Sequence, residues 1–420
     1  MAWLNEAVDF ILGLGPSVML PIIIFIVALI FGVKVSKAIR SGLTIGIGFV
    51  GIGLVVGLLV DNLAPAAQQM VERFGIELTT IDMGWPAAAA GAWAFQFAAL
   101  IIPIAIAVNL IMIALKWTKT LNIDIWNFWH FISIAAIAYF VTGMLWLAIL
   151  CAIIRQVVCL ITADKTAPMV SEFYGLEGVS IATGSTVGVG LLGMPIAWVI
   201  SKIPGIKNIN VDTETIQKSM GIFGEPMMMG IFIGLGIGIA AGLPLDGILN
   251  LGISLGGVMF LMPRMVKILM EGLIPISESA REFMKKRFKG RELYIGLDAA
   301  VTIGHPANIA TGLILVPITL LLAVIIPGNT VLPFGDLATI PFYMAFVVGS
   351  RKGNILHSVL AGTISIGLML LMATNMAPVH TEFMGGIMDI PEGATYVSSL
   401  DLGGNPVAWI LYRFAELFRP

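Results

Sequence analysis

Long apolar segments, separated by short polar or glycine-rich breaks, run through most of this 420-residue chain. A membrane-spanning helix needs about 20 mostly apolar residues. The segments that come near this length are 16–33, 42–60, 92–115, 129–150, 141–162, 226–242, 248–270, 299–326, 334–349 and 354–374. We therefore predict an all-α polytopic membrane protein, in which 129–162 crosses twice with a tight turn near Gly143.

Two further apolar segments, 179–201 and 405–418, are short and are interrupted by Pro195 and Pro406. Short apolar segments that proline or glycine breaks often line a cavity in membrane proteins instead of facing lipid. We expect these two segments to form reentrant or half helices.

Composition supports the membrane prediction and excludes other classes. Hydrophobic residues make up 58% of the chain and charged residues only 11%, whereas soluble domains carry about 25% charged residues. The net charge of −2 offers no basic face for nucleic acid. The two cysteines, Cys151 and Cys159, would lie roughly 12 Å apart on a helix, too far for a disulfide, and we expect both to be buried. No metal or cofactor motif is apparent.

Positive charge is concentrated in alternate connections between the apolar segments. Basic residues follow the first and third spans, fill the middle of the chain, and recur at 264–291 and at Arg351–Lys352. The intervening connections, 61–91, 243–247, 327–333 and 375–404, contain Arg73 as their one basic residue. Because lysine and arginine favour the cytoplasmic side, we predict an external N-terminus, a cytoplasmic middle segment and a cytoplasmic C-terminus.

The two halves of the sequence resemble each other. Four pairs share a separation of 210 residues: Pro16 with Pro226, Gly32 with Gly242, Gly42 with Gly252, and Pro65 with Pro275. Pro103 and Pro317, segments 124–131 and 336–343, and segments 195–200 and 406–411 follow at separations within four residues of that value. We predict two repeats, 1–203 and 221–420, joined by a cytoplasmic linker at 204–220.

The charge pattern gives these repeats opposite orientations in the membrane. Inverted repeats are typical of alternating-access transporters, whose substrate site lies near the midplane between the copies. From this symmetry alone, a transporter, a channel and a receptor without turnover all stay open.

Five stretches carry a family resemblance: GLTIGIGFVGIGLVVGLLVDNLAPAA (42–67), DIWNFWH (124–130), FGEP (223–226), IGLDAA (295–300) and VLPFGDLATI (331–340). They resemble the galactitol-type membrane IIC component of the bacterial phosphoenolpyruvate-dependent sugar phosphotransferase system, to which ascorbate-type IIC components are more distantly related. The resemblance covers essentially the whole chain.

The resemblance implies a homodimer in the bacterial inner membrane, with about eleven crossings per chain. It also implies a substrate-carrying core domain and a dimer-forming scaffold domain, interleaved from both repeats, that move relative to each other in an elevator-like alternating access. A cytoplasmic IIB subunit, phosphorylated on cysteine and supplied by a IIA subunit, would phosphorylate the sugar. The chain itself has no G-x-x-x-x-G-K-[ST] phosphate loop and no plausible phosphocysteine, so the phosphoryl donor must be another polypeptide.

Ionisable side chains within apolar segments are costly and indicate function by default. His130 lies among aromatic residues and shares a broad helical face with Asn127. Paired donors and acceptors beside an apolar wall suit a polyol, although tryptophan and histidine also populate interfacial belts. Ascorbate-type relatives contact substrate through histidine-bearing segments of this kind.

Two acids and the segment 85–87 are further candidates. Asp336 begins an apolar segment, where it could bind hydroxyl groups, act as a general base or simply cap a helix; the resemblance favours a substrate role. Asp298 and the Trp85, Pro86 and Ala87 segment precede glycine- or alanine-rich runs that allow a ligand close to the backbone. Trp85 could instead anchor the chain at the interface.

Hydroxyl-bearing runs occupy matching places in the two halves. Thr183, Gly184 and Ser185 in the first run, and Ser398 and Ser399 in the second, could bind sugar hydroxyls or simply pack within the bundle. Galactitol-type relatives commonly carry a His-Gly pair where this chain has Thr183 and Gly184, a departure that bears on substrate identity. Glu225 precedes Pro226, so it could cap a helix or contribute to gating or substrate binding.

We therefore predict a permease that binds galactitol or a similar sugar alcohol and moves it inward, coupled to phosphorylation by a partner subunit. The alternative is an ion-coupled secondary transporter, in which Asp124, Asp298 and Asp336 bind H⁺ or Na⁺.

Overall fold

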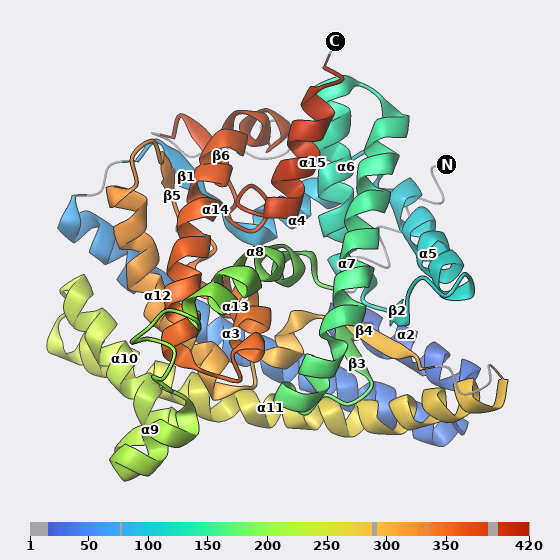
Figure 1. Cartoon of the computed structure of the whole chain (residues 1–420), viewed down its shortest axis with the longest axis horizontal. Coiled ribbons are helices and arrows are strands. Elements are labelled where there is room, and N and C mark those ends of the chain that lie inside the picture. The colour runs from blue at the N-terminus through green and yellow to red at the C-terminus, as the bar shows by residue number, and fades with distance from the viewer. Residues whose placement is uncertain (1–15, 76–77, 288–291, 334, 385–393, 420) are drawn as a thin grey trace.

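The computed structural model of the chain describes residues 16–75, 78–287, 292–333, 335–384 and 394–419 (Figure 1). Within them, six helical segments are long and apolar enough to cross a membrane. They are α3 (Val35–Phe74), the continuous segment Ile125–Thr142 that contains α6 (Trp129–Thr142), α7 (Leu145–Tyr174), the first part of α11 (Leu245–Arg287), α12 (Pro306–Ile325) and α14 (Ile355–Met384). The prediction of a helical membrane protein with several spans is confirmed.

Shorter helices complete the fold. They are α2 (Pro16–Ile30), α4 (Gly84–Trp93), α5 (Ala98–Ala114), α8 (Gly184–Ile200), α9 (Thr213–Met220), α10 (Pro226–Ala241), α13 (Ile340–Ser350) and α15 (Pro406–Glu416). Four 3₁₀ turns, η1 (Ile125–Phe128), η2 (Gly221–Gly224), η3 (Ala299–Thr302) and η4 (Leu337–Thr339), precede longer helices.

Two segments that read as uniform apolar runs are divided in the structure. The expected span 92–115 contains the whole of α5 but begins in the last two residues of α4, and the axes of α4 and α5 bend by 96°. The run 129–162 divides between α6 and α7 at Gly143, which adopts φ 68°. Because this left-handed conformation ends a helix at little cost only for glycine, the predicted turn near Gly143 is confirmed.

The two longest helices, α3 with 40 residues and α11 with 43, extend well beyond their apolar segments. At 1.5 Å per residue each is about 60 Å long, twice the thickness of the hydrocarbon core. They pack against each other, and α10 packs along α11 (Figure 1). Glycines bring the backbones close: a Cβ on Gly234 would lie 2.7 Å from the Cα of Gly252. Small residues at such contacts are a usual means of helix packing in membranes.

The fold also contains two small parallel sheets, which the hydrophobic pattern did not predict. One has the order β5 (Val331–Leu332), β1 (Thr80–Asp82), β6 (Tyr396–Ser398); the other has the order β2 (Thr120–Asn122), β4 (Tyr294–Leu297), β3 (Val179–Ile181). In each sheet the central strand comes from one half of the chain and both outer strands come from the other half. Because the strands are parallel, their carboxyl ends lie along one edge of each sheet, and the segments that follow them come together.

Candidate functional site

Five aspartates occur at or just after the ends of these strands. Asp82 ends β1, and Asp124, Asp298, Asp336 and Asp401 follow β2, β4, β5 and β6. The carboxylates of Asp82, Asp124, Asp336 and Asp401 belong to residues that are at most 3% exposed. Buried carboxylates must be hydrogen-bonded or paired to persist, so the partners of each one define its role.

Asp82 and Asp336 form one tightly bonded pair, which we call the acidic bracket. The backbone N–H groups of Gly84, Leu400 and Asp336 donate to the Asp82 carboxylate at 3.0–3.1 Å. The Asp336 carboxylate in turn accepts from the backbone N–H of Trp85 at 2.7 Å and of Asp401 at 2.8 Å, and from the Ser399 hydroxyl at 2.9 Å. The bracket therefore fastens three segments from both halves of the chain, and its carboxylate oxygens are occupied.

Asp124 and Asp298 form a second, less saturated pair. The side-chain amide of Asn127 donates to both carboxylates, at 2.6 Å to Asp124 and by a short contact to Asp298. Asp298 also accepts from the backbone N–H of Ala300 at 2.6 Å. Thr183 joins this group, because its hydroxyl accepts from the Ala299 N–H at 2.9 Å. One Asp124 oxygen has no hydrogen-bond partner.

A cavity of about 100 Å³ lies between the two acidic pairs. This is several times the space that one buried water needs on the same measure. Its walls combine apolar and aromatic surface with hydroxyl, amide, imidazole and carboxylate groups. The lining residues are Val56, Trp85, Trp126, Asn127, Trp129, His130, Thr183, Ser185, Asp298, Ala338, Thr339, Phe342 and Asp401.

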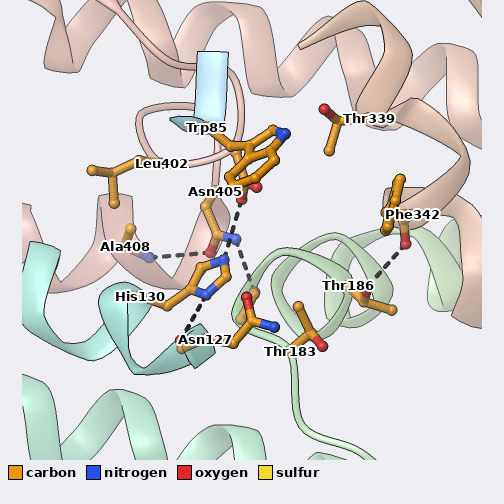
Figure 2. Close-up of polar contacts among 12 residues, drawn as sticks. Trp85, Asn127, His130, Thr183, Thr186, Thr339, Phe342, Leu402, Asn405 and Ala408 are labelled. Atoms are coloured by element: carbon orange, nitrogen blue, oxygen red, sulfur yellow. Dashed lines mark hydrogen bonds and ion pairs between the residues drawn. The ribbon is translucent and has the colours of Figure 1, made fainter. Parts of the chain in front are cut away.

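His130 is the most constrained side chain of the cavity (Figure 2). Its Nδ1 lies 3.0 Å from the Asn127 carbonyl oxygen, and its ring stacks on Trp129 with 3.8 Å between centroids. The other nitrogen, Nε2, lies 3.6 Å from Oδ1 of Asp401. Gly184 packs against the same ring, and a Cβ added there would lie 2.7 Å from the imidazole Cγ. The first residue of α8 therefore leaves room for the ring.

Hydrogen bonds between α8 and the second half of the chain hold the cavity walls together (Figure 2). Asn405 caps α15 through its side-chain oxygen, which accepts from Val407 and Ala408, and its amide donates to the Gly184 carbonyl at 3.0 Å. The Thr186 hydroxyl donates to the Phe342 carbonyl at 2.9 Å. The start of α8 is thus fixed by contacts to α15 and α13.

Seven of the predicted site residues lie at this cavity. Trp85, Asn127, His130, Thr183, Ser185 and Asp298 line it, and Gly184 backs the His130 ring. Asp336 and Ser399 lie behind the wall, where the acidic bracket uses their polar atoms.

The other four predicted residues lie elsewhere. Ala87 and Ser398 face a separate void of about 10 Å³ beside His380. Pro86 is exposed. Glu225 precedes α10, makes no side-chain cap bond, and is not among the residues that line the cavity.

Sequence reasoning missed Asp82 and Asp401. Both lie in connections, 61–91 and 375–404, that the charge pattern assigned to external loops. The available signal was an aspartate after a short β-branched or hydroxyl-rich run, as in TTID and VSSLD. Within the described residues, no set of three or more histidine, cysteine, aspartate or glutamate side chains is arranged to hold a metal ion.

Comparison with known proteins supplies the family. The model described as "EIIC-GAT: PTS system sugar-specific permease component" matches residues 10–393. The chain is similar to the "PTS system galactitol-specific EIIC component" of Escherichia coli (strain K12), with 41% identity over 97% of this chain and 90% of that protein. It is also 41% identical to a "Putative permease IIC component" of the same strain, over 97% of this chain and 94% of that protein.

Proposed function

Because this chain belongs to the EIIC-GAT family of sugar-specific permease components of the phosphotransferase system, we propose that it binds a sugar alcohol, with galactitol as the first candidate. It carries the sugar alcohol inward and holds it for phosphorylation by a separate IIB subunit. The observation that carries this proposal is the cavity between the two acidic pairs, with its mixture of tryptophan faces and unsaturated polar groups.

The chemistry of the cavity suits a linear polyol. Each hydroxyl group both donates and accepts a hydrogen bond, and the walls offer the carboxylate of Asp298, the amide of Asn127 and the hydroxyls of Thr183 and Ser185. Trp85, Trp126 and Trp129 provide apolar faces for the C–H groups. A sugar alcohol carries no charge, so it fits a site in which the acids are bonded mainly to the protein.

We propose that this chain positions the sugar and that a partner subunit supplies the phosphoryl group. Phosphoryl transfer depends mainly on positioning and electrostatic stabilisation, and a permease can supply the positioning. Cys151 and Cys159 lie buried on α7, out of reach of a phosphoryl carrier. The phosphoryl donor is then a separate polypeptide, and the family resemblance implies that it is a IIB subunit, phosphorylated on cysteine and supplied by IIA.

Two inverted repeats, 1–203 and 221–420, joined by the linker 204–220, account for the architecture that we propose. The exchange of strands between halves supports it, because each sheet combines one strand of one half with two of the other. In the described part of the chain, six apolar spans, or seven if the bent pair α4 and α5 is one span, occur beside shorter apolar helices. This supports the family's plan of about eleven crossings together with reentrant or half helices. The N-terminus is external and the C-terminus cytoplasmic, as the distribution of lysine and arginine indicates.

We further propose that the protein is a homodimer with an elevator-like motion, in which a core domain moves against a scaffold domain. We assign α3, α10 and α11 to the scaffold domain, and the two sheets with α8 and α13 to the core domain. Exposed apolar residues at helical spacing on α3, Leu43, Ile47, Val50 and Leu54, support a surface that meets lipid or a second copy. The protein then works as a multi-pass homodimer of the bacterial inner membrane.

Calorimetric titration of the purified protein with galactitol, mannitol and sorbitol tests the proposed substrate class. We expect galactitol to bind most tightly, because a site that hydrogen-bonds hydroxyls distinguishes their arrangement. Absence of binding for every sugar alcohol, in protein shown to be folded by its thermal transition, would contradict the proposal.

A further inference from the structure

Two buried hydrogen-bond acceptors face each other across one corner of the cavity. The Nδ1 of His130 lies 3.0 Å from a carbonyl oxygen, which cannot donate, so the network assigns the ring proton to Nδ1. With the ring proton on Nδ1, the other nitrogen, Nε2, is an acceptor. It faces Oδ1 of Asp401, and both atoms are buried without a hydrogen-bond partner. Both residues line the cavity.

The spacing of these two atoms leaves the corner open. They are 3.6 Å apart, whereas a charge-assisted N–H···O bond is about 2.7–2.9 Å long. Asp401 is held in place by its backbone N–H, which donates to Asp336 at 2.8 Å, and by the turn in which the Leu402 N–H donates to the Ser399 hydroxyl. His130 is fixed by Asn127 and Trp129. The corner thus presents two rigid acceptors that lack donors.

Arg155 is a buried basic residue of α7. Its side chain is 1% exposed, and all three guanidinium nitrogens lack a hydrogen-bond partner. Its charge interacts with that of Asp401. An unpaired ion in a membrane interior is expensive, and arginine does not lose its proton in proteins. Arg155 therefore needs an acidic partner, and Asp401 is the aspartate with which its charge interacts.

We propose that Asp401 is a specificity-determining residue, which together with Nε2 of His130 accepts hydrogen bonds from two neighbouring hydroxyl groups of the sugar alcohol. Arg155 is a positioning residue that acts on Asp401 without touching the substrate. This inference rests on the proposed function and deepens it. A ligand that lacks either hydroxyl leaves a buried acceptor unpaired, which is the arrangement that discriminates most strongly against deoxy analogues.

The test compares galactitol with its monodeoxy analogues by calorimetric titration of the purified protein, without IIB. We expect Asp401→Asn to weaken galactitol binding by about 10- to 100-fold, the usual loss for a hydrogen bond to a charged group. The analogue without the hydroxyl that Asp401 recognises should bind the wild type and Asp401→Asn equally. Asp246→Asn is the matched control, because Asp246 is exposed in the first turn of α11.

Arg155 variants separate positioning from a structural role. Arg155→Met should weaken galactitol binding about tenfold, Arg155→Lys should retain most of the affinity, and Arg155→Met should add no further loss to Asp401→Asn. A structural role predicts instead that Arg155→Met weakens all analogues equally and in addition to Asp401→Asn. The double variant removes both charges together, so it keeps the test informative if a single variant fails to fold.

The outcomes distinguish this inference from the proposed function. If galactitol binds the wild type but Asp401→Asn and the double variant bind every analogue as the wild type does, the inference is wrong and the proposed function stands. If the wild type binds no sugar alcohol, the proposed function itself is wrong, and the inference falls with it.

Discussion

At the scale of single residues, the site depends on which polar atoms remain free after the fold is made. Asp336 and His130 both belong to motifs that the sequence singles out. Both carboxylate oxygens of Asp336 accept hydrogen bonds from the protein within the acidic bracket. In contrast, Nε2 of His130 has no hydrogen-bond partner at the cavity. Residue type and spacing can nominate such side chains. They cannot tell an acceptor that holds the protein together from one that holds a ligand.

Gly184→Ala tests the position of the His130 ring. The added Cβ would lie 2.7 Å from the imidazole Cγ, so the ring must move from its present position. We expect galactitol affinity to fall by about 5- to 50-fold and the free energy of unfolding to fall by about 1–3 kcal/mol. Titration and thermal unfolding measure the two effects.

Gly53→Ala is the control for this substitution. Gly53 lies within α3, and nothing is within 4 Å of a Cβ added there, so affinity should not change and the helix should gain slightly in stability. Unaltered affinity in Gly184→Ala would show that the His130 ring does not hold the substrate.

Asp336→Asn tests the acidic bracket. An asparagine would turn an N–H₂ group toward either the Ser399 hydroxyl and the Asp401 N–H or the Trp85 N–H, leaving buried donors opposed. We expect a loss of about 1–3 kcal/mol in the free energy of unfolding, together with weaker sugar binding because Trp85 and Asp401 shift. A variant that binds the sugar weakly at full stability would instead make Asp336 a direct ligand.

At the scale of elements, the hydrophobic pattern located the helical segments but not their ends. The apolar part of α3 and of α11 ends before the helix does, and both helices continue through polar residues. The bend between α4 and α5 was missed because residues 92–115 are apolar on both sides of it. The strands were missed because two to four residues are too few to show an alternating pattern.

Packing of α10 against α11 gives a prediction at this scale. A Cβ on Gly230 would lie 2.6 Å from the carbonyl oxygen of Leu255, whereas a Cβ on Gly236 of the same helix would meet nothing within 4 Å. Gly230→Leu should therefore separate the helices and cost about 1–3 kcal/mol or more, and Gly236→Leu should not. Thermal unfolding of the two variants in detergent compares them directly, and equal transitions would mean that this contact does not stabilise the scaffold.

At the scale of the whole molecule, the two halves of the chain complete each other. The sheets, the acidic bracket and the contacts of Asn405 and Thr186 all join residues that are more than 100 positions apart. The sequence comparison of the halves could anticipate related copies. It could not anticipate that each half contributes strands to a sheet of the other half, because strand pairing depends on contacts that no local pattern records.

Because the two halves of the chain pair in this way, the cavity contains polar groups from both of them. Asn127, His130 and Thr183 come from the first half, and Asp298, Thr339 and Asp401 come from the second. Under the inverted-repeat architecture that we propose, such a site would open to either side of the membrane as one group of elements moves against the other. Transport coupled to phosphorylation is therefore the central claim to test.

The most direct test reconstitutes the protein in liposomes, with labelled galactitol outside and phosphorylated IIB enclosed. Our account predicts that galactitol phosphate accumulates inside, and that none forms when IIB is absent or unphosphorylated. Accumulation of unmodified galactitol, driven by a proton or sodium gradient without IIB, would contradict it and would identify an ion-coupled transporter instead.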